Sequence, residues 1–139
     1  MRLTKLEQFK DLVGSSIVAI PTGNNRNRKV KEQTPVLFGV DSIGRKYVKL
    51  ARLDENHKRI RQPESYDPKY GSTQSAINAG YSGNAGYIFF ECLDDIAVFR
   101  NINKMKLEIS EYCRFCAFEM SDEDVRTVHQ IVSKYQGKR

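Results

Sequence analysis

The spacing of apolar residues changes twice along the first half of the chain. Near the N-terminus an apolar stripe recurs at helical spacing, Thr4 and Glu7 have the spacing of a capping box, and Gly14 suits a helix end. The stripe comprises Leu6, Phe9, Leu12 and Val13. Residues 16–20 are a nearly continuous apolar run, and residues 36–41 alternate between apolar and other positions. The pattern predicts a short helix, then a buried strand, then a strand with one buried face.

The following segments predict a hairpin and further strands. Residues 45–53 have the composition of a strand, and their imperfect alternation indicates a bulge. Gly44 is expected at positive φ in the tight turn before them. A short piece at 58–61 extends the predicted sheet, and residues 87–93 predict another strand.

The last third of the chain is predicted to be helical. Asp94 and Asp95 begin one helix, and residues 107–118 are ambiguous, with continued helix preferred. Ser121 is expected to cap a final helix. The apolar stripe of that helix comprises Val125, Val128, Ile131, Val132 and Tyr135.

Residues 62–86 differ in composition from their surroundings. They hold four of the nine Gly, two of the four Pro and three Tyr, but Ile77 is their only large aliphatic residue. Such a segment buries little, which predicts a long loop insertion. Its Tyr, Ser, Gly and Asn residues are typical of adaptable binding loops, although a solvated insertion explains them equally well.

Length and composition set the class of protein. A chain of 139 residues, 40% hydrophobic and 29% charged, suits one small domain with an appendage. No apolar run is long enough to span a membrane, no signal peptide is evident, and three Cys argue against a secreted disulfide scaffold. The sequence predicts a cytoplasmic α+β protein. Residues 1–95 would form an N-terminal helix and a small SH3-like β-barrel with the insertion at 62–86, and residues 96–139 a helical C-terminal extension.

Positive charge is concentrated in the first half of the chain. Residues 1–61 carry 14 basic and 6 acidic side chains, whereas residues 62–139 carry 9 basic and 11 acidic side chains. The basic clusters comprise Arg26, Arg28, Lys29 and Lys31, then Arg45, Lys46, Lys49 and Arg52, then Lys58, Arg59 and Arg61. They indicate a surface for a polyanion, or else ordinary solvated faces of strands and loops. Tyr66, Tyr70 and Tyr81 are the aromatic side chains predicted to stack on bases beside them.

Two motifs carry a family resemblance. Residues 20–25 read Ile-Pro-Thr-Gly-Asn-Asn, with Arg26 and Arg28 following, and residues 43–48 read Ile-Gly-Arg-Lys-Tyr-Val. The combination resembles a group of small β-barrel domain proteins of bacteriophages and bacteria, over roughly residues 14–95. The resemblance implies a small SH3-like barrel and a phage or prophage origin, and it brings no catalytic residues. If the strands pair in sequence, the first motif would hold Arg26 and Arg28 near Arg45 and Lys46.

Side chains that could support catalysis or hold a cofactor are few. The chain has two His and none of the nucleophile, nucleotide or zinc-protease motifs, so we expect no enzyme and no cofactor. Cys113 and Cys116 have zinc-ligand spacing, with Cys92 and His129 as conceivable further ligands. Because a second pair is missing, small buried cysteines are the preferred interpretation, and no metal site is predicted.

Two functions follow as expectations. The first is a phage-type accessory protein that binds nucleic acid through the basic barrel face. The alternative is a phage-encoded inhibitor of anti-restriction or anti-CRISPR type. It would bind a host defence or nucleoprotein complex through residues 62–86 and the helical tail. Neither involves a membrane, and a homodimer through exposed sheet edges stays open.

Overall fold

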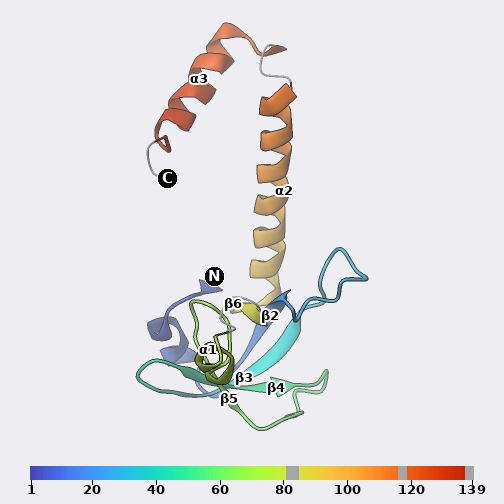
Figure 1. The fold of residues 1–139 in the computed structure, drawn as a ribbon, viewed down its shortest axis with the longest axis vertical. Coiled ribbons are helices and arrows are strands. Elements are labelled where there is room, and N and C mark those ends of the chain that lie inside the picture. The colour runs from blue at the N-terminus through green and yellow to red at the C-terminus, as the bar shows by residue number, and fades with distance from the viewer. Residues whose placement is uncertain (81–84, 116–118, 137–139) are drawn as a thin grey trace. The chain divides into compact units, whose positions relative to one another are not determined.

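A computed structural model describes residues 1–80, 85–115 and 119–136 of the chain (Figure 1). These ranges contain six strands: β1 (Arg2–Leu3), β2 (Ser16–Gly23), β3 (Val36–Ile43), β4 (Val48–Leu53), β5 (Glu64–Tyr66) and β6 (Ala85–Phe90). The helices are η1 (Leu6–Leu12), α1 (Gln74–Asn78), α2 (Leu93–Phe115) and α3 (Asp122–Ser133). The chain divides into two compact units, Met1–Val98 and Phe99–Arg139.

The strands form one antiparallel sheet in the order β1-β6-β2-β3-β4-β5. The α+β class is therefore as predicted. The expected barrel is not closed by strand pairing, because β1 and β5 lie at the two edges of the described sheet. A single backbone bond ties the chain beyond β5 to β6, where the Tyr87 N–H donates to the Gly71 oxygen at 3.0 Å.

One face of the sheet holds the hydrophobic core. Phe38 and Val40 of β3 are buried there, as the alternation of residues 36–41 predicts. In β2, Ile17–Ile20 are all buried, as the continuous apolar run predicts, and Ile17 and Ala19 belong to this core. Phe38 packs edge to face against aromatic rings of β5 and β6, with centroids 5.0–5.8 Å apart. These ring contacts show that the sheet curls around its core even though its edges do not pair.

The N-terminal helix forms, but its cap differs from the prediction. η1 is a 3₁₀ helix, and the Gln8 side chain accepts from the backbone N–H groups of Thr4 and Lys5 at 2.7 and 3.0 Å. The predicted Thr4–Glu7 pairing is therefore wrong, because Gln8 binds these donors. Gly14, at φ +85°, follows the helix in the conformation expected of a stop.

Residues 62–86 are more ordered than predicted. The segment contains β5, α1 and the first residues of β6, and Tyr66, Pro68 and Ser72 are buried. Gly71 explains how it packs so closely: at φ +69°, a Cβ there would lie 1.7 Å from the Tyr87 oxygen. The prediction of a segment that buries little is wrong for its described part, because backbone pairing and aromatic packing replace aliphatic burial.

The helical prediction for the C-terminal third holds in the described residues. α2 continues to Phe115, and the Ser121 hydroxyl caps α3 by accepting from the Asp124 N–H at 3.2 Å. No described side chain of residues 99–139 is buried. The stability of the fold therefore comes from the core of the first unit.

Candidate nucleic-acid interface

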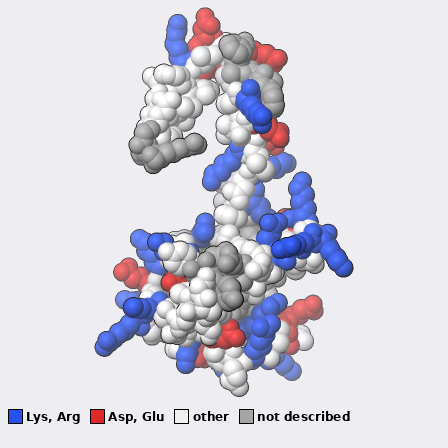
Figure 2. Space-filling view, viewed as in Figure 1, with Lys and Arg blue, Asp and Glu red and all other residues white. Residues whose placement is uncertain are grey.

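The predicted basic clusters occupy opposite ends of the sheet. Because β2, β3 and β4 are antiparallel neighbours, the loop after β2 and the connection after β4 lie at one end of β3. The β3–β4 hairpin lies at the other end, about 24 Å away for eight strand residues. The expected proximity of Arg26 and Arg28 to Arg45 and Lys46 is therefore wrong, although the strands do pair in sequence. Figure 2 shows Lys and Arg side chains in separate groups over this unit.

The β2–β3 loop is held in shape by a buried amide. Gln33 is only 7% exposed, and its Oε1 accepts from the Asn27 N–H at 2.7 Å. Its Nε2 donates to the backbone oxygens of Asn27 and Val30 at 2.9 and 3.1 Å. The Asn27 side chain in turn accepts from the Lys29 N–H at 3.0 Å. The loop is therefore built around Gln33, a residue that the sequence analysis missed.

All four cations of this loop point to solvent. We call Arg26, Arg28, Lys29 and Lys31 the loop surface, and each of its side chains is exposed. Across the described ranges, none of the four forms an ion pair with a carboxylate. Their charges are therefore available to an external anion, held by a loop whose backbone is already ordered.

The third cluster lies in the β4–β5 connection and is partly neutralised. Lys58 and Arg61 are exposed, but Arg59 donates to Asp41 at 2.6 Å. The chain returns beside β4 here, because the Ile60 N–H donates to the Arg52 oxygen at 2.9 Å. The predicted sheet extension at 58–61 is thus present as a short bridge.

The three predicted stacking tyrosines differ in position. Tyr66 is 7% exposed and lies in the aromatic core, so its ring offers no face to a base. Its burial also raises the pKa of its phenol well above the ordinary value. The prediction of Tyr66 as a stacking residue is wrong, and Tyr81 lies outside the described residues. Tyr70 is 51% exposed, with the Lys69 ammonium 5.3 Å from its ring centroid.

Contacts through β6 connect Tyr70 with the base of the loop. The Asn25 side chain donates to the Gly86 oxygen at 3.0 Å. A Cβ on Gly86 would lie 2.9 Å from the Tyr70 oxygen, so the two backbones are in close contact. Gly86 of β6 therefore contacts both Asn25, which precedes the loop surface, and the backbone of Tyr70, whose ring is exposed.

Arg45 and Lys46 lie beside a shallow depression at the other end of β3. The depression has a volume of about 420 Å³, and Ser42, Lys49 and Ser65 also line it. The predicted positive φ of Gly44 is wrong; this glycine instead lies close to the Tyr47 oxygen, and its N–H donates there at 2.8 Å. Lys49 belongs to the predicted basic cluster, but the two serines were missed because only strand register brings them beside it.

The structure describes one member of the cysteine pair, Cys113, which is exposed and not buried as expected. Cys113 and His129 both line a depression of about 430 Å³ in the second unit, whereas Cys116 lies outside the described residues. Within the described ranges, no three His, Cys, Asp or Glu side chains are grouped closely enough to hold a metal ion. The helices of those ranges include none with the length and apolar character that crossing a membrane requires.

The two motifs of the family resemblance both lie at strand ends. Residues 20–25 complete β2 and turn into the loop, where Gly23 has φ +55°, and residues 43–48 make the β3–β4 hairpin. The resemblance itself stays a prediction. No protein-family model, curated protein or solved structure matches the chain.

Proposed function

We propose that the protein binds nucleic acid through the loop surface. The observation that carries the proposal is the β2–β3 loop itself, in which the buried Gln33 amide orders the backbone while four unpaired cations face solvent. A loop that is ordered before binding loses less conformational entropy when it meets a ligand. Cations at fixed positions suit a ligand whose anions are also regularly spaced, as phosphates are along a strand.

The neighbouring side chains support the same kind of ligand. Lys58 and Arg61 are exposed at the same end of β3 and would extend the positive surface. Tyr70 presents a half-exposed ring, and stacking of a base on such a ring contributes about 1–3 kcal/mol. Because no base-reading element is evident, we expect binding with little sequence preference.

Fluorescence anisotropy with labelled single-stranded and duplex DNA and RNA tests the proposal. The slope of log affinity against log salt is about −0.9 per phosphate contact on duplex DNA and about −0.7 on single strands. Reversing Arg26, Arg28 and Lys29 to Glu should therefore make the slope shallower by about 2 to 3 and abolish binding at moderate salt.

A charge-matched variant serves as the control. Reversal of Lys104, Lys106 and Arg126, all exposed in the second unit, also lowers the formal charge from +6 to 0. We expect this control to keep the slope of the original protein and most of its affinity. Equal losses in both variants would mean that net charge alone attracts the ligand, which contradicts a defined loop surface.

A protein partner is the second candidate, and exposed apolar side chains of the second unit favour it. Ile102, Met105, Ile109 and Tyr112 share one face of α2 and are 43–63% exposed. Such a face is typical of a surface that packs against another helix. The predicted inhibitor of a host complex would use it, and a pull-down from nuclease-treated host lysate tests this. Loss of capture by Ile109→Asp but not by Leu107→Asp, an exposed change outside this face, would support it.

A further inference from the structure

The depression at the β3–β4 hairpin has the chemistry of an anion site. We call it the hairpin pocket; its polar lining comprises Ser42, Arg45, Lys46, Tyr47, Lys49 and Ser65. Three of these side chains are cations, three carry hydroxyls, and none is a carboxylate. Ammonium, guanidinium and hydroxyl groups are the usual side-chain donors to phosphate oxygens.

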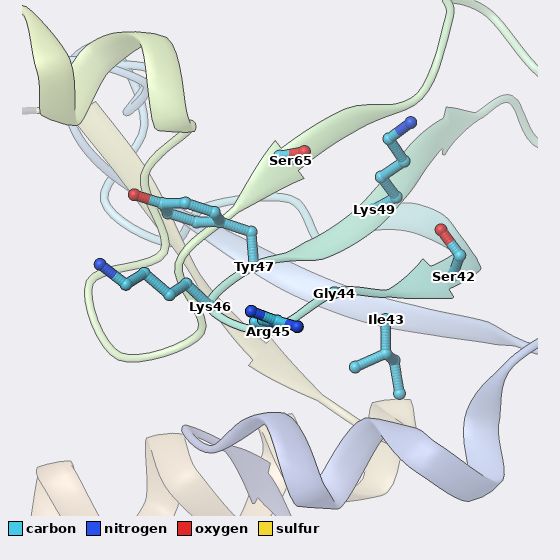
Figure 3. A pocket seen from close by; sticks show the side chains of 8 residues that line it. All are labelled: Ser42, Ile43, Gly44, Arg45, Lys46, Tyr47, Lys49 and Ser65. Atoms are coloured by element: carbon cyan, nitrogen blue, oxygen red, sulfur yellow. The ribbon is translucent and has the colours of Figure 1, made fainter.

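Strand register places the lining residues on one face of the sheet. Ser42 of β3 pairs with Lys49 of β4, and Lys49 pairs with Ser65 of β5. Residues paired directly across an antiparallel sheet project to the same side. Figure 3 shows Ser42 and Lys49 on a common side, with Ile43 projecting the opposite way. Lys49 is thus flanked by a serine on each neighbouring strand.

A β-bulge determines which residue faces Lys49. The register of β3 against β4 shifts between Val40 and Ser42, so Asp41 is the extra residue of β3. In an unbroken ladder Asp41 would stand opposite Lys49, and the two would form an ion pair. Instead, Arg59 donates to Asp41 at 2.6 Å, and Asp41 lines a different depression. The bulge and Arg59 together leave the hairpin pocket without a carboxylate.

The two residues at the tip of the hairpin also line the pocket. The Gly44 N–H donates to the Tyr47 oxygen at 2.8 Å, which leaves Arg45 and Lys46 as the two residues of the turn. Both are exposed, and in the described chain neither forms an ion pair. The Tyr47 ring lies beside them in Figure 3. The lining of the pocket therefore includes cations from the turn and from β4.

We propose that the hairpin pocket is a phosphate-binding site, separate from the loop surface. The source of this phosphate rests on the proposed function: it is a phosphate group of the bound nucleic acid. The pocket would then contact the same ligand about 24 Å from the loop surface, which corresponds to roughly seven base pairs of a duplex. Two separated contacts on one strand raise the overall affinity without either being strong.

Titration with inorganic phosphate tests the pocket without nucleic acid. Amide chemical shifts of the isotope-labelled full chain are followed against sodium chloride at equal ionic strength. We expect saturable changes at Tyr47, Lys49 and Ser65. Arg45→Gln with Lys49→Gln should weaken phosphate binding at least about tenfold, because charged hydrogen bonds are lost. Lys104→Gln with Lys106→Gln, a charge-matched control at exposed positions of the second unit, should leave the dissociation constant within about twofold of the original.

The outcomes separate this inference from the proposed function. Chemical-shift changes that spread over every basic segment would overturn the pocket as a site. Chemical-shift changes that persist in Arg45→Gln with Lys49→Gln would overturn it as well. Saturable changes confined to the pocket, in a protein that binds no oligonucleotide, would support the pocket and contradict the proposed function. The same double variant is then compared with the original protein on oligonucleotides. If the variant binds a 5′-phosphorylated strand more weakly but a 5′-hydroxyl strand equally well, the pocket binds a terminal phosphate. If it binds both strands more weakly to the same degree, the pocket binds an internal phosphate, and either result supports the site.

Discussion

The substitution Gln33→Leu tests whether the buried amide orders the basic loop. The leucine keeps most of the side-chain volume but removes hydrogen bonds to Asn27 and Val30. Three such bonds contribute about 0.5–1.5 kcal/mol each, and the loop groups that lose their partner become accessible to water. We expect the free energy of opening the loop to fall by about 2–3 kcal/mol, with a smaller fall in the free energy of global unfolding.

Native-state hydrogen exchange at the Asn27 amide measures this opening directly, because that N–H donates to Gln33 at 2.7 Å. A loss of 2–3 kcal/mol corresponds to exchange that is faster by roughly 30-fold to 150-fold. The exposed Gln62, changed to Leu, is the matched control and should leave the exchange rate unchanged.

The same variant connects loop order with binding. Since a disordered loop must be ordered when ligand binds, Gln33→Leu should weaken nucleic-acid binding although every cation is retained. Unchanged exchange at Asn27 would refute the structural role of Gln33. Fast exchange with undiminished affinity would refute the argument that loop order contributes to binding.

Three further predictions concern packing, pH and association. Gly71→Ala should lower the free energy of unfolding by at least about 3 kcal/mol, because the alanine Cβ would collide with the backbone oxygen of Tyr87 in β6. Gly80→Ala, at a similar φ in open space, should lower it by only about 1–2 kcal/mol in the same denaturation experiment. Burial raises the pKa of Tyr66, so its stabilising effect is complete below about pH 10 and lost as pH rises further. Tyr66→Phe should therefore lose less stability between about pH 9 and 11 in alkaline denaturation, and parallel curves would contradict this. Sedimentation equilibrium tests the homodimer through exposed sheet edges: Ile109→Asp, a change outside the sheet, should leave the protein a dimer, whereas a monomeric original protein would contradict such a dimer.

Local sequence patterns predicted the elements that depend on local interactions. The alternation around Phe38, the cap at Ser121 and the turn at Gly23 each reflect neighbours within a few residues, and the structure has all three. The pairing order was not predictable in this way. β6 lies between β1 and β2, although about seventy residues separate it from them, and no local pattern records such a pairing.

The errors in the candidate site have the same origin. Tyr66 has the sequence neighbours of an exposed loop residue, but pairing with Val48 places its ring in the core. The imperfect alternation of residues 45–53 predicted a bulge in that strand. The bulge lies instead in its partner β3, where Asp41 is the extra residue. The separation of the basic clusters likewise follows from strand direction, which charge counts along the sequence do not contain.

The salt dependence of nucleic-acid binding, compared between the two charge-matched variants, tests the central claim most directly. The claim predicts that reversal of Arg26, Arg28 and Lys29 makes the slope shallower by about 2 to 3 units. It also predicts that reversal of Lys104, Lys106 and Arg126 leaves the slope as it is in the original protein. Equal slopes in the two variants, or no binding by the original protein even at low salt, would contradict the claim.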